Sequence, residues 1–569
     1  MTQELYLQHK KTYHPSKHSK NRSKIAITIF ILIIFLTGGI AVYHFSRNEI
    51  KIPILHSKIK VYIDQSLIQT HYNNLKEYVE KQDKKYEITD DSSLADILVT
   101  TQKIDERCKP FYEIDFLPVQ RFATLNESVS NSQIKSIILG KEKNYEYINI
   151  KGFEEVTNNI FGVGQNDEKI VVDNKDDLKS ALDQTSKRIA LIPFSWLDPT
   201  MKVLKIEDNS PLDTPTPFRF AEYLCAKEED IRDFIENTNK MEYHDTIDYT
   251  KVATVIQTGV TAMGRNVYIK MIAEKDPAYI SYKISPLSRG ADLTHTSNEV
   301  SFSKDCTQTA NTMRFCAKPE FIETLKACGI DLVELTGNHN NDWGHEANLY
   351  TLNLYKENGI AYFGGGVNLE EAKKPFITDI KGTKIAFLGY NWYDAVGGGN
   401  PSALATATLP GANPYDEQAI KEDIQKLRKE VDIIIVDIQF QECWAYSENN
   451  TICYRADAVN YQQDVFRKIK DFGADIVVGT QAHQPQGFEI RKDGIIFYGL
   501  GNLFFDQIVY TGTREELILK HYFYKGKYIN TTIYTAFYDS DYQPYITRGE
   551  ERKGLLQKLF KASGWNITE

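Results

Sequence analysis

The sequence lacks several features that would place it in broad protein classes. It has no basic surplus: 67 Lys plus Arg face 77 Asp plus Glu, a net charge of −10 over 569 residues, which argues against a dedicated nucleic-acid binder. None of the seven cysteines has Cys-x-x-Cys spacing, which argues against a cysteine-ligated metal site. Only one long apolar run is present, and the composition is that of a globular chain (42% hydrophobic, 25% charged). Collagen, long disorder and a polytopic membrane protein are therefore excluded.

The single long apolar run covers residues 25–43, which carry no charge and would span about 28 Å as a helix. Residues 1–24 hold six basic side chains and one acid, a net charge of +5, so the remainder of the chain is −15. A signal peptide has a shorter apolar region and a small-residue cleavage site, whereas His44 and Phe45 follow this run. We therefore expect an uncleaved helix in the cell membrane, with residues 1–24 as a cytoplasmic stub and the bulk of the chain outside.

An exported body makes disulfides possible. Cys306 and Cys316 bracket one polar insert, Cys443 and Cys453 bracket another, and each spacing could close a local loop. Cys108, Cys225 and Cys328 are left over. Because the count is odd, at least one thiol is unpaired, and Cys328, in an apolar helical stretch, is expected to be a small core residue.

Two modules of α/β class are expected after a linker at residues 44–57. Residues 58–240 alternate strand-like and helix-like segments and show no catalytic constellation. Phrases such as FLPVQRFATLNESVSNSQIKSIILGK resemble periplasmic solute-binding modules, although a plain α/β domain without a ligand explains them equally well. Residues 250–515 contain β-branched runs alternating with amphipathic stretches, which predicts buried strands layered with helices. Residues 516–569 are expected to complete that domain with a β-hairpin and a helix.

Amide, imidazole and carboxylate side chains recur where the predicted strands of the second module end. In sheets of this kind, functional groups collect at the carboxyl ends of the strands. A single such loop is ordinary turn chemistry, but four in one domain indicate a site. The residues are Glu299, Asn338, His339, Asp342, Gln439, Glu442, Gln481, His483 and Asn502, with Arg265 upstream.

The phrases GIDLVELTGNHNNDWG, GADIVVGTQAHQPQGFE and FYGLGNLFFD resemble the capsule-synthesis protein A, or poly-gamma-glutamate synthesis, family of the calcineurin-like metallophosphoesterase superfamily. The resemblance runs from about residue 254 to 506. It implies an αββα sandwich with the site at the strand ends.

The sequence also departs from the family pattern. Val260 stands where the family has a metal-ligating Asp, Gln439 where it often has His, and Gln481 where the first His of Gly-x-His-x-His belongs. Two ions need a bridging carboxylate and several further ligands. One divalent ion (Mn, Fe or Zn) or none is therefore expected.

The resemblance implies roles for the residues that survive. Glu299, Asn338, His339 and His483 would hold an ion, and His339, His483 and Asp342 would carry catalysis, with Asp342 orienting His339. Substrate contacts would come from Arg265, Gln439, Glu442, Gln481 and Asn502. An ion pair explains Arg265, and turn capping Asn502, equally well.

Two hypotheses follow. The chain is an enzyme that uses metal-assisted hydrolysis or transfer on an anionic cell-envelope polymer, or it is a non-catalytic anchored factor that binds polymer or partners through an old metal cleft. Either role implies other membrane components of a capsule synthesis machinery as partners, and neither involves nucleic acid.

Overall fold

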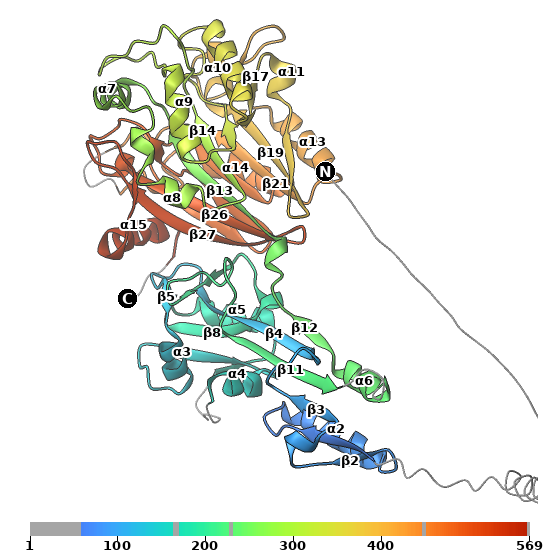
Figure 1. Cartoon of the computed structure of the whole chain (residues 1–569). Coiled ribbons are helices and arrows are strands. Elements are labelled where there is room, and N and C mark those ends of the chain that lie inside the picture. Colours follow the sequence, from blue (N-terminus) through green and yellow to red (C-terminus); the bar gives the residue numbers. More distant parts are fainter. Residues whose placement is uncertain (1–57, 163–169, 227–231, 447–450, 566–569) are drawn as a thin grey trace, which may run out of the picture.

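The computed structural model describes residues 58–162, 170–226, 232–446 and 451–565 (Figure 1). The predicted cytoplasmic stub, membrane helix and linker (1–24, 25–43 and 44–57) lie outside these residues. Within the described ranges, none of the helices combines the length and apolarity needed to cross a membrane. Two bodies are stacked end to end, and the chain passes from the first to the second just before β13 (Val252–Thr261) (Figure 1).

The first body is built on one sheet of ten strands in the order β2-β1-β3-β11-β4-β8-β6-β7, with β9 and β12 also paired to β4. Its strands are β1 (Ile59–Ile63), β2 (Tyr86–Ile88), β3 (Ile97–Thr100), β4 (Cys108–Arg121), β6 (Glu146–Ile150), β7 (Ile170–Val172), β8 (Arg188–Pro193), β9 (Met201–Val203), β11 (Arg219–Ala226) and β12 (Tyr243–Asp245), and β5 (Ser128–Val129) pairs with β10 (Lys205–Ile206). Its helices are α2 (Gln69–Lys81), α3 (Asn131–Ile138), α4 (Glu154–Phe161), α5 (Lys175–Asp183) and α6 (Arg232–Thr238).

A disulfide fixes the two strands that join the halves of this sheet. Strand β4 is 14 residues long and pairs with β11 near its start and with β8 near its end. Cys108 lies opposite Cys225 in the β4–β11 register, and the two form a disulfide. The sequence left both cysteines unassigned, because strand pairing across 117 residues of sequence has no local signal.

The second body contains two larger sheets. The first consists of β13, β14 (Leu293–Asn298), β15 (Leu332–Glu334), β16 (Ala361–Phe363), β25 (Asn502–Phe504), β26 (Glu515–Tyr524), β27 (Lys527–Phe537) and β28 (Tyr545–Ile546). The second has the order β18-β19-β21-β22-β24-β23: β18 (Phe376–Ile380), β19 (Thr383–Asn391), β21 (Ile433–Gln439), β22 (Ile476–Thr480), β24 (Gly494–Phe497) and β23 (Phe488–Arg491). A short pair, β17 (Gly365–Gly366) and β20 (Gly411–Ala412), completes the strands.

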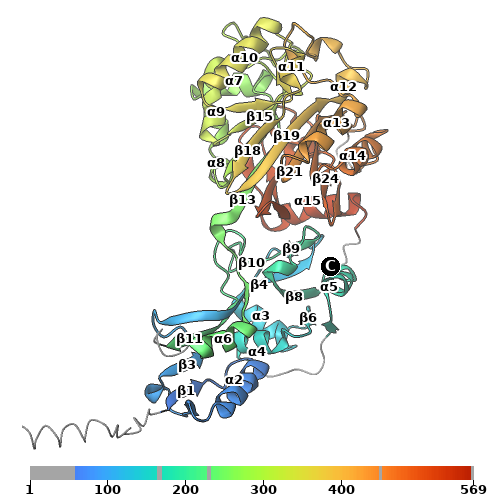
Figure 2. The ribbon, with the colours of Figure 1, turned by 90° about the vertical axis from the view of Figure 1, so that its right-hand side faces the viewer.

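Helices cover the outer faces of the two sheets (Figure 2). Against the first sheet lie α7 (Arg265–Glu274), α8 (Ser285–Ser288), α9 (Ile322–Ala327) and α10 (His345–Glu357), and with the second lie α11 (Leu369–Ala372), α12 (Trp392–Ala395), α13 (Glu417–Leu427) and α14 (Gln462–Asp471). An apolar core between the sheets joins residues of both, such as Val255 and Ile435, and α15 (Gly549–Ala562) packs on it through Leu559. The observed layers are therefore helix, sheet, sheet, helix, as the predicted sandwich requires.

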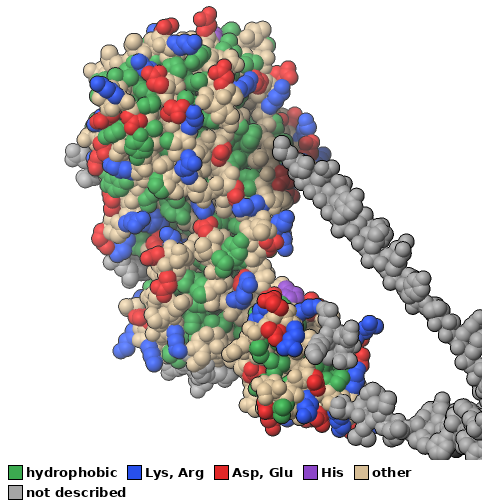
Figure 3. All heavy atoms as spheres, viewed as in Figure 1, with side chains coloured by type: hydrophobic (Ala, Val, Ile, Leu, Met, Phe, Trp, Pro, Cys, Tyr) green, Lys and Arg blue, Asp and Glu red, His purple; other side chains and the backbone are tan. Residues whose placement is uncertain are grey.

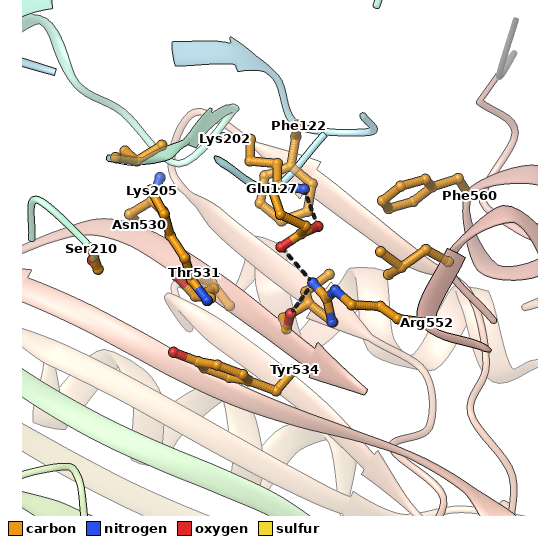
Figure 4. A pocket seen from close by; sticks show the side chains of 14 residues that line it. Phe122, Glu127, Lys202, Lys205, Ser210, Asn530, Thr531, Tyr534, Arg552 and Phe560 are labelled. Carbon is orange, nitrogen blue, oxygen red and sulfur yellow. Dashed lines mark hydrogen bonds and ion pairs between the residues drawn. The ribbon is translucent and has the colours of Figure 1, made fainter. Parts of the chain in front are cut away.

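The two bodies meet across a seam that combines apolar packing with ion pairs, and Figure 4 shows a partly buried ionic cluster in it. Lys202 of the first body donates to Glu127 at 2.5 Å, and Arg552 of α15 donates to the same carboxylate at 2.9 Å. Burial alone would raise the pKa of Glu127, but the two cations outweigh it and the pKa lies below its usual value. The carboxylate therefore stays ionised and ties α15 to the first body. Elsewhere, acidic and basic side chains are interspersed over the face shown in Figure 3.

A polar chain crosses the apolar core between the two sheets of the second body. Asp437 of β21 accepts a hydrogen bond from the Gln257 amide of β13 at 3.0 Å and lies 2.8 Å from Nε2 of His295 on β14. His521 continues the chain, with Nε2 3.0 Å from the Gln257 oxygen. All four side chains are essentially inaccessible, so each depends on the others for a polar partner.

Replacing Asp437 should therefore destabilise the fold strongly. Asp437→Ala removes one member of a buried charged group and should lower the free energy of unfolding by about 3–5 kcal/mol in urea denaturation. Asp471→Ala is the matched control, because Asp471 forms a surface pair with Arg491 and is 64% exposed. That change should cost less than about 1 kcal/mol. Equal losses of unfolding free energy in the two variants would show that the polar contacts between the sheets do not stabilise the fold.

Candidate functional site

The loops that follow the central strands bring the predicted residues together at one end of the second body. Helices α7 and α10, which start beside this region, lie at the end remote from the first body (Figure 1). In the first sheet, Glu299 follows β14, and Asn338, His339 and Asp342 follow β15. In the second sheet, Gln439 ends β21, Glu442 comes three residues later, and Gln481 and His483 follow β22. Asn502 begins β25, and Arg265 begins α7. We call the group Arg265, Glu299, His339, Asp342, Glu442 and His483 the strand-end site.

Four rings and one cation pack together and organise the site. The Arg265 guanidinium lies 4.6 Å from the ring centre of Phe315 and 5.1 Å from that of Phe505. Phe315 in turn packs on His339 at 4.1 Å, and Phe505 stacks on His483 at 4.8 Å. The two phenylalanine rings also contact each other edge to face, with centres 6.3 Å apart, so the guanidinium lies beside both rings and each ring contacts one histidine. Cations over aromatic faces are stabilised by the ring quadrupole, so the two rings hold a positive charge near both histidines.

Asp506 fixes the cation in place. It pairs with the Arg265 guanidinium and accepts hydrogen bonds from the backbone N–H and the side-chain amide of Asn266 at 3.1 and 2.9 Å. Of the two interpretations that the sequence left open, the structure shows Arg265 in an ion pair. Its charge still acts on the site, because it lowers the pKa of both Glu299 and Glu442.

Glu299 is the most unusual side chain of the site. It is fully buried, and neither carboxyl oxygen has a hydrogen-bond partner among the described residues. Burial raises its pKa to about 7, against the opposing effects of His339 and Arg265. Gly337 makes this placement possible, because a Cβ there would lie 2.3 Å from the Cα of Glu299. An unpaired carboxyl at neutral pH indicates a group that exchanges protons or receives a ligand donor.

The two histidines differ in protonation. Nδ1 of His339 lies 2.6 Å from Asp342, and although burial opposes it, the carboxylates of Asp342 and Glu299 raise the pKa of His339 above its usual value. His483 is buried, hydrogen-bonded to Asn502 at 2.8 Å, and burial lowers its pKa to about 4. At neutral pH His483 is therefore neutral, whereas His339 keeps its proton to a higher pH than an ordinary histidine does.

Glu442 completes the site on its solvent side. Its carboxylate lies 3.5 Å from Nε2 of His483, and burial together with Glu299 raises its pKa to about 7. The side chains of His339 and Asp342 are each 18% exposed and that of Glu442 14%, whereas Glu299 is inaccessible. Solvent or a ligand therefore enters along these three residues.

The predicted amide residues mostly bind one another. Gln439 donates to the Asn338 oxygen at 3.0 Å and to the Gln481 oxygen. Asn502 uses its amide on two backbone carbonyls and its oxygen on His483, so it positions that histidine. Gln481 and His483 have φ of 75° and 51°, a region that non-glycine residues rarely adopt and that is common at functional loops.

Two predicted disulfides hold the loops of the site. Cys306–Cys316 closes the loop that delivers Phe315, and Cys443–Cys453 begins directly after Glu442. The remaining cysteine, Cys328, is free and buried, as the sequence predicted.

The donor set does not fit the superfamily's metal centre. In the described part of the chain no three His, Cys, Asp or Glu side chains are placed to hold an ion. Nδ1 of His339 is committed to Asp342 and Nδ1 of His483 to Asn502, and Val260 packs in the apolar core. Catalytic zinc sites use three protein ligands. The strand-end site as folded therefore lacks a set of three converging ligands among the described residues.

Sequence reasoning missed Phe315 and Phe505 and left Asp506 open between a site residue and a turn cap. Phe505 and Asp506 end the phrase FYGLGNLFFD, which gives a local signal. Phe315 has none, because its importance depends on the Cys306–Cys316 disulfide folding its loop onto His339.

The second body is thus an α/β protein of one class: a two-sheet sandwich with acid–base side chains at the ends of its strands. Residues 254–507 match the model of the family "Bacterial capsule synthesis protein PGA_cap". Capsule biosynthesis protein CapA of Bacillus anthracis is 27% identical over 277 residues, covering 47% of this chain. PGA biosynthesis protein CapA of Bacillus subtilis (strain 168) is 26% identical over 320 residues, covering 55% of this chain and 79% of that protein.

The match spans 63% of the B. anthracis protein, less than two thirds of its length. Among solved structures, a 5′-nucleotidase precursor from Thermus thermophilus aligns with 55% of this chain and 58% of its own at 12% identity and a TM-score of 0.29. An ABC-type phosphate transport receptor from Vibrio cholerae aligns with 32% of this chain and 93% of its own at 12% identity and a TM-score of 0.22. At these TM-scores neither likeness defines a ligand or a reaction.

The pKa of Glu299 predicts a specific pH dependence of stability. Its folded-state pKa of about 7 lies above the usual 4.5, so its contribution to stability is complete below pH 4.5 and is lost as the pH rises through 7. Glu299→Gln does not titrate. Its free energy of unfolding, measured relative to wild type, should therefore rise by up to about 3 kcal/mol between about pH 4.5 and pH 8.

Glu430→Gln is the matched control, because Glu430 lies on the surface. Denaturant unfolding at several pH values should give parallel curves for this variant and wild type. A parallel curve for Glu299→Gln would contradict the raised pKa.

Proposed function

We propose that this chain takes part in the biosynthesis or export of an anionic capsule polymer of poly-γ-glutamate type. The match of residues 254–507 to the capsule synthesis family and the names of the two CapA relatives support this process. The uncharged run at 25–43 supports a single membrane anchor, with the two bodies outside the cell membrane. Other membrane components of a capsule synthesis machinery would then be its partners.

Within that process, we propose that the strand-end site transfers protons during cleavage of the polymer's amide linkages. One observation carries this proposal. A histidine with a raised pKa, His339, lies beside two carboxyl groups, Glu299 and Glu442, whose pKa is about 7. Groups that titrate near the working pH are the most effective general acids and bases. A purely structural site would not need two buried carboxyls that are half ionised at neutral pH.

The exposure of Glu442 and the Asp342 contact of His339 support a division of roles between these two residues. Glu442, which reaches solvent, accepts a proton from water as the water oxygen bonds to the amide carbon. His339, held by Asp342, donates its Nε2 proton to the amide nitrogen as the carbon–nitrogen bond breaks. Glu442 then returns a proton to solvent and His339 takes one up. The Arg265 charge keeps Glu299 and Glu442 ionisable despite their burial.

A non-catalytic assembly factor is the second candidate. The lack of three suitably placed metal-ligating side chains in the described residues favours it, together with the apolar Val260 and the mutual hydrogen bonds of Gln439 and Gln481. In that case the strand-end site would bind polymer or a partner without changing it.

Chain-length measurement on poly-γ-glutamate separates the two candidates. Incubation with the full chain in detergent should shorten the polymer, as followed by gel filtration. The rate should rise with pH through about 7 as Glu442 ionises, and fall at higher pH as His339 loses its proton. Glu442→Gln and His339→Asn should each lower the rate at least about 100-fold, in line with loss of a general base or acid.

His244→Asn, in the first body and 39% exposed, is the matched control and should leave the rate unchanged. Treatment with EDTA should also leave it unchanged. If EDTA abolished the shortening and Mn, Fe or Zn restored it, the mechanism would be ion-assisted hydrolysis and not the proton transfer proposed above. Bound but unshortened polymer would favour the assembly factor.

A further inference from the structure

A second surface feature lies apart from the strand-end site, between α15 and the edge of the second sheet. It is a groove of about 910 Å³. Figure 2 shows α14, β24 and α15 on the same side of the second body. The groove is lined by the segment after Cys453, by α14, by β23 and by the last turns of α15. Its lining residues include Tyr454, Arg455, Arg467, Phe488, Lys558 and Lys561. We call this feature the α15 groove.

The α15 groove is positive, whereas the chain as a whole is negative. Four cations line it, Arg455, Arg467, Lys558 and Lys561, against two anions, Asp457 and Glu489. The whole chain carries a net charge of −10. A concave positive surface on an acidic protein raises the local concentration of anions there.

The cations present their charges outward. Lys558 is 43% exposed and Arg455 is 56% exposed, each with one carboxylate neighbour, Glu515 and Asp457 respectively. Lys561 is exposed and has no ionic partner among the described residues. Arg467 pairs with Glu489, which also accepts from the Tyr498 hydroxyl at 2.6 Å. Lys561 therefore contributes a positive charge that no described carboxylate pairs with, and it lies on the α15 side of the groove.

The floor of the groove is apolar. Phe488 is 2% exposed and Tyr454 is 3% exposed, and the Lys558 ammonium lies 5.2 Å from the Tyr454 ring centre. Because both residues are almost inaccessible, the contacts open to a ligand are mainly the exposed cations, which a flexible chain of carboxylates matches.

The groove is joined to the strand-end site through two short segments. Phe488 comes five residues after His483, so their Cα atoms are at most about 18 Å apart. Tyr454 follows Cys453, whose disulfide partner Cys443 is next to Glu442, and the Tyr454 carbonyl accepts from the Gly487 N–H at 2.8 Å. A polymer of a few residues can therefore reach from one to the other.

We propose that the α15 groove binds an extended, carboxylate-rich stretch of the polymer and retains it beside the strand-end site. This inference rests on the proposed function, since it takes the capsule polymer as the ligand. It adds a binding surface remote from the reacting linkage and explains how an acidic protein holds a polyanion.

Binding of fluorescent poly-γ-glutamate to the full chain in detergent tests the groove. Lys558→Gln combined with Lys561→Gln should weaken binding at least tenfold at low salt and flatten its dependence on salt, because exposed charges are screened. Lys558→Arg with Lys561→Arg should restore wild-type binding. The matched control is Lys426→Gln with Lys429→Gln, two exposed lysines with the same spacing on and just after α13.

The outcomes separate this inference from the proposed function. Equal binding by wild type and the groove variant would overturn the groove while leaving the polymer as ligand. Equal weakening in the α13 control would show that general charge, not the groove, attracts the polymer. No binding by wild type would overturn the proposed function and the groove together. The neutral polymer dextran should bind neither protein.

Discussion

The packing of the Arg265 guanidinium against both Phe315 and Phe505 is the constraint on which the site depends. The same two rings pack on His339 and His483, so one group of ring contacts positions the cation and both histidines. Two buried carboxyls, Glu299 and Glu442, lie within reach of this charge. Burial raises the pKa of both carboxyls to about 7, and His339 and then Arg265 act in the opposite direction on each.

The backbone explains why this group of ring contacts holds its geometry. Strand β25, which leads into Phe505 and Asp506, lies against β13, and a Cβ at Gly259 would be 2.1 Å from the Gly501 carbonyl. Only glycine allows this approach, so the segments that lead to Arg265 and to Phe505 and Asp506 follow two adjoining strands, β13 and β25. Phe315 is fixed by the neighbouring Cys316 disulfide, and Glu442 by the disulfide that starts at Cys443. The site is therefore assembled by sheet pairing and covalent closure together.

Much of this could be predicted from the sequence, because strand-end positions are encoded locally. The β-branched runs placed β13, β14, β15, β21 and β22, and the polar residues after them converge as the topology of such sheets requires. The local disulfides followed from spacing. What could not be predicted depends on tertiary contact: the Cys108–Cys225 bridge, the packing of Phe315 on His339, and the Arg265–Asp506 pair across 241 residues. The burial that raises the pKa of Glu299 is likewise a property of the folded chain.

The central claim is that burial raises the pKa of the strand-end carboxyls and that Arg265, together with His339, limits this rise. The most direct measurement is a carboxyl-¹³C NMR titration of Glu299 in wild type and in Arg265→Met, with Glu299→Gln used to assign the signal. Wild type should titrate near pH 7, and loss of the guanidinium should move the midpoint to higher pH. An unchanged midpoint in Arg265→Met, or a wild-type midpoint near the usual 4.5, would contradict the account.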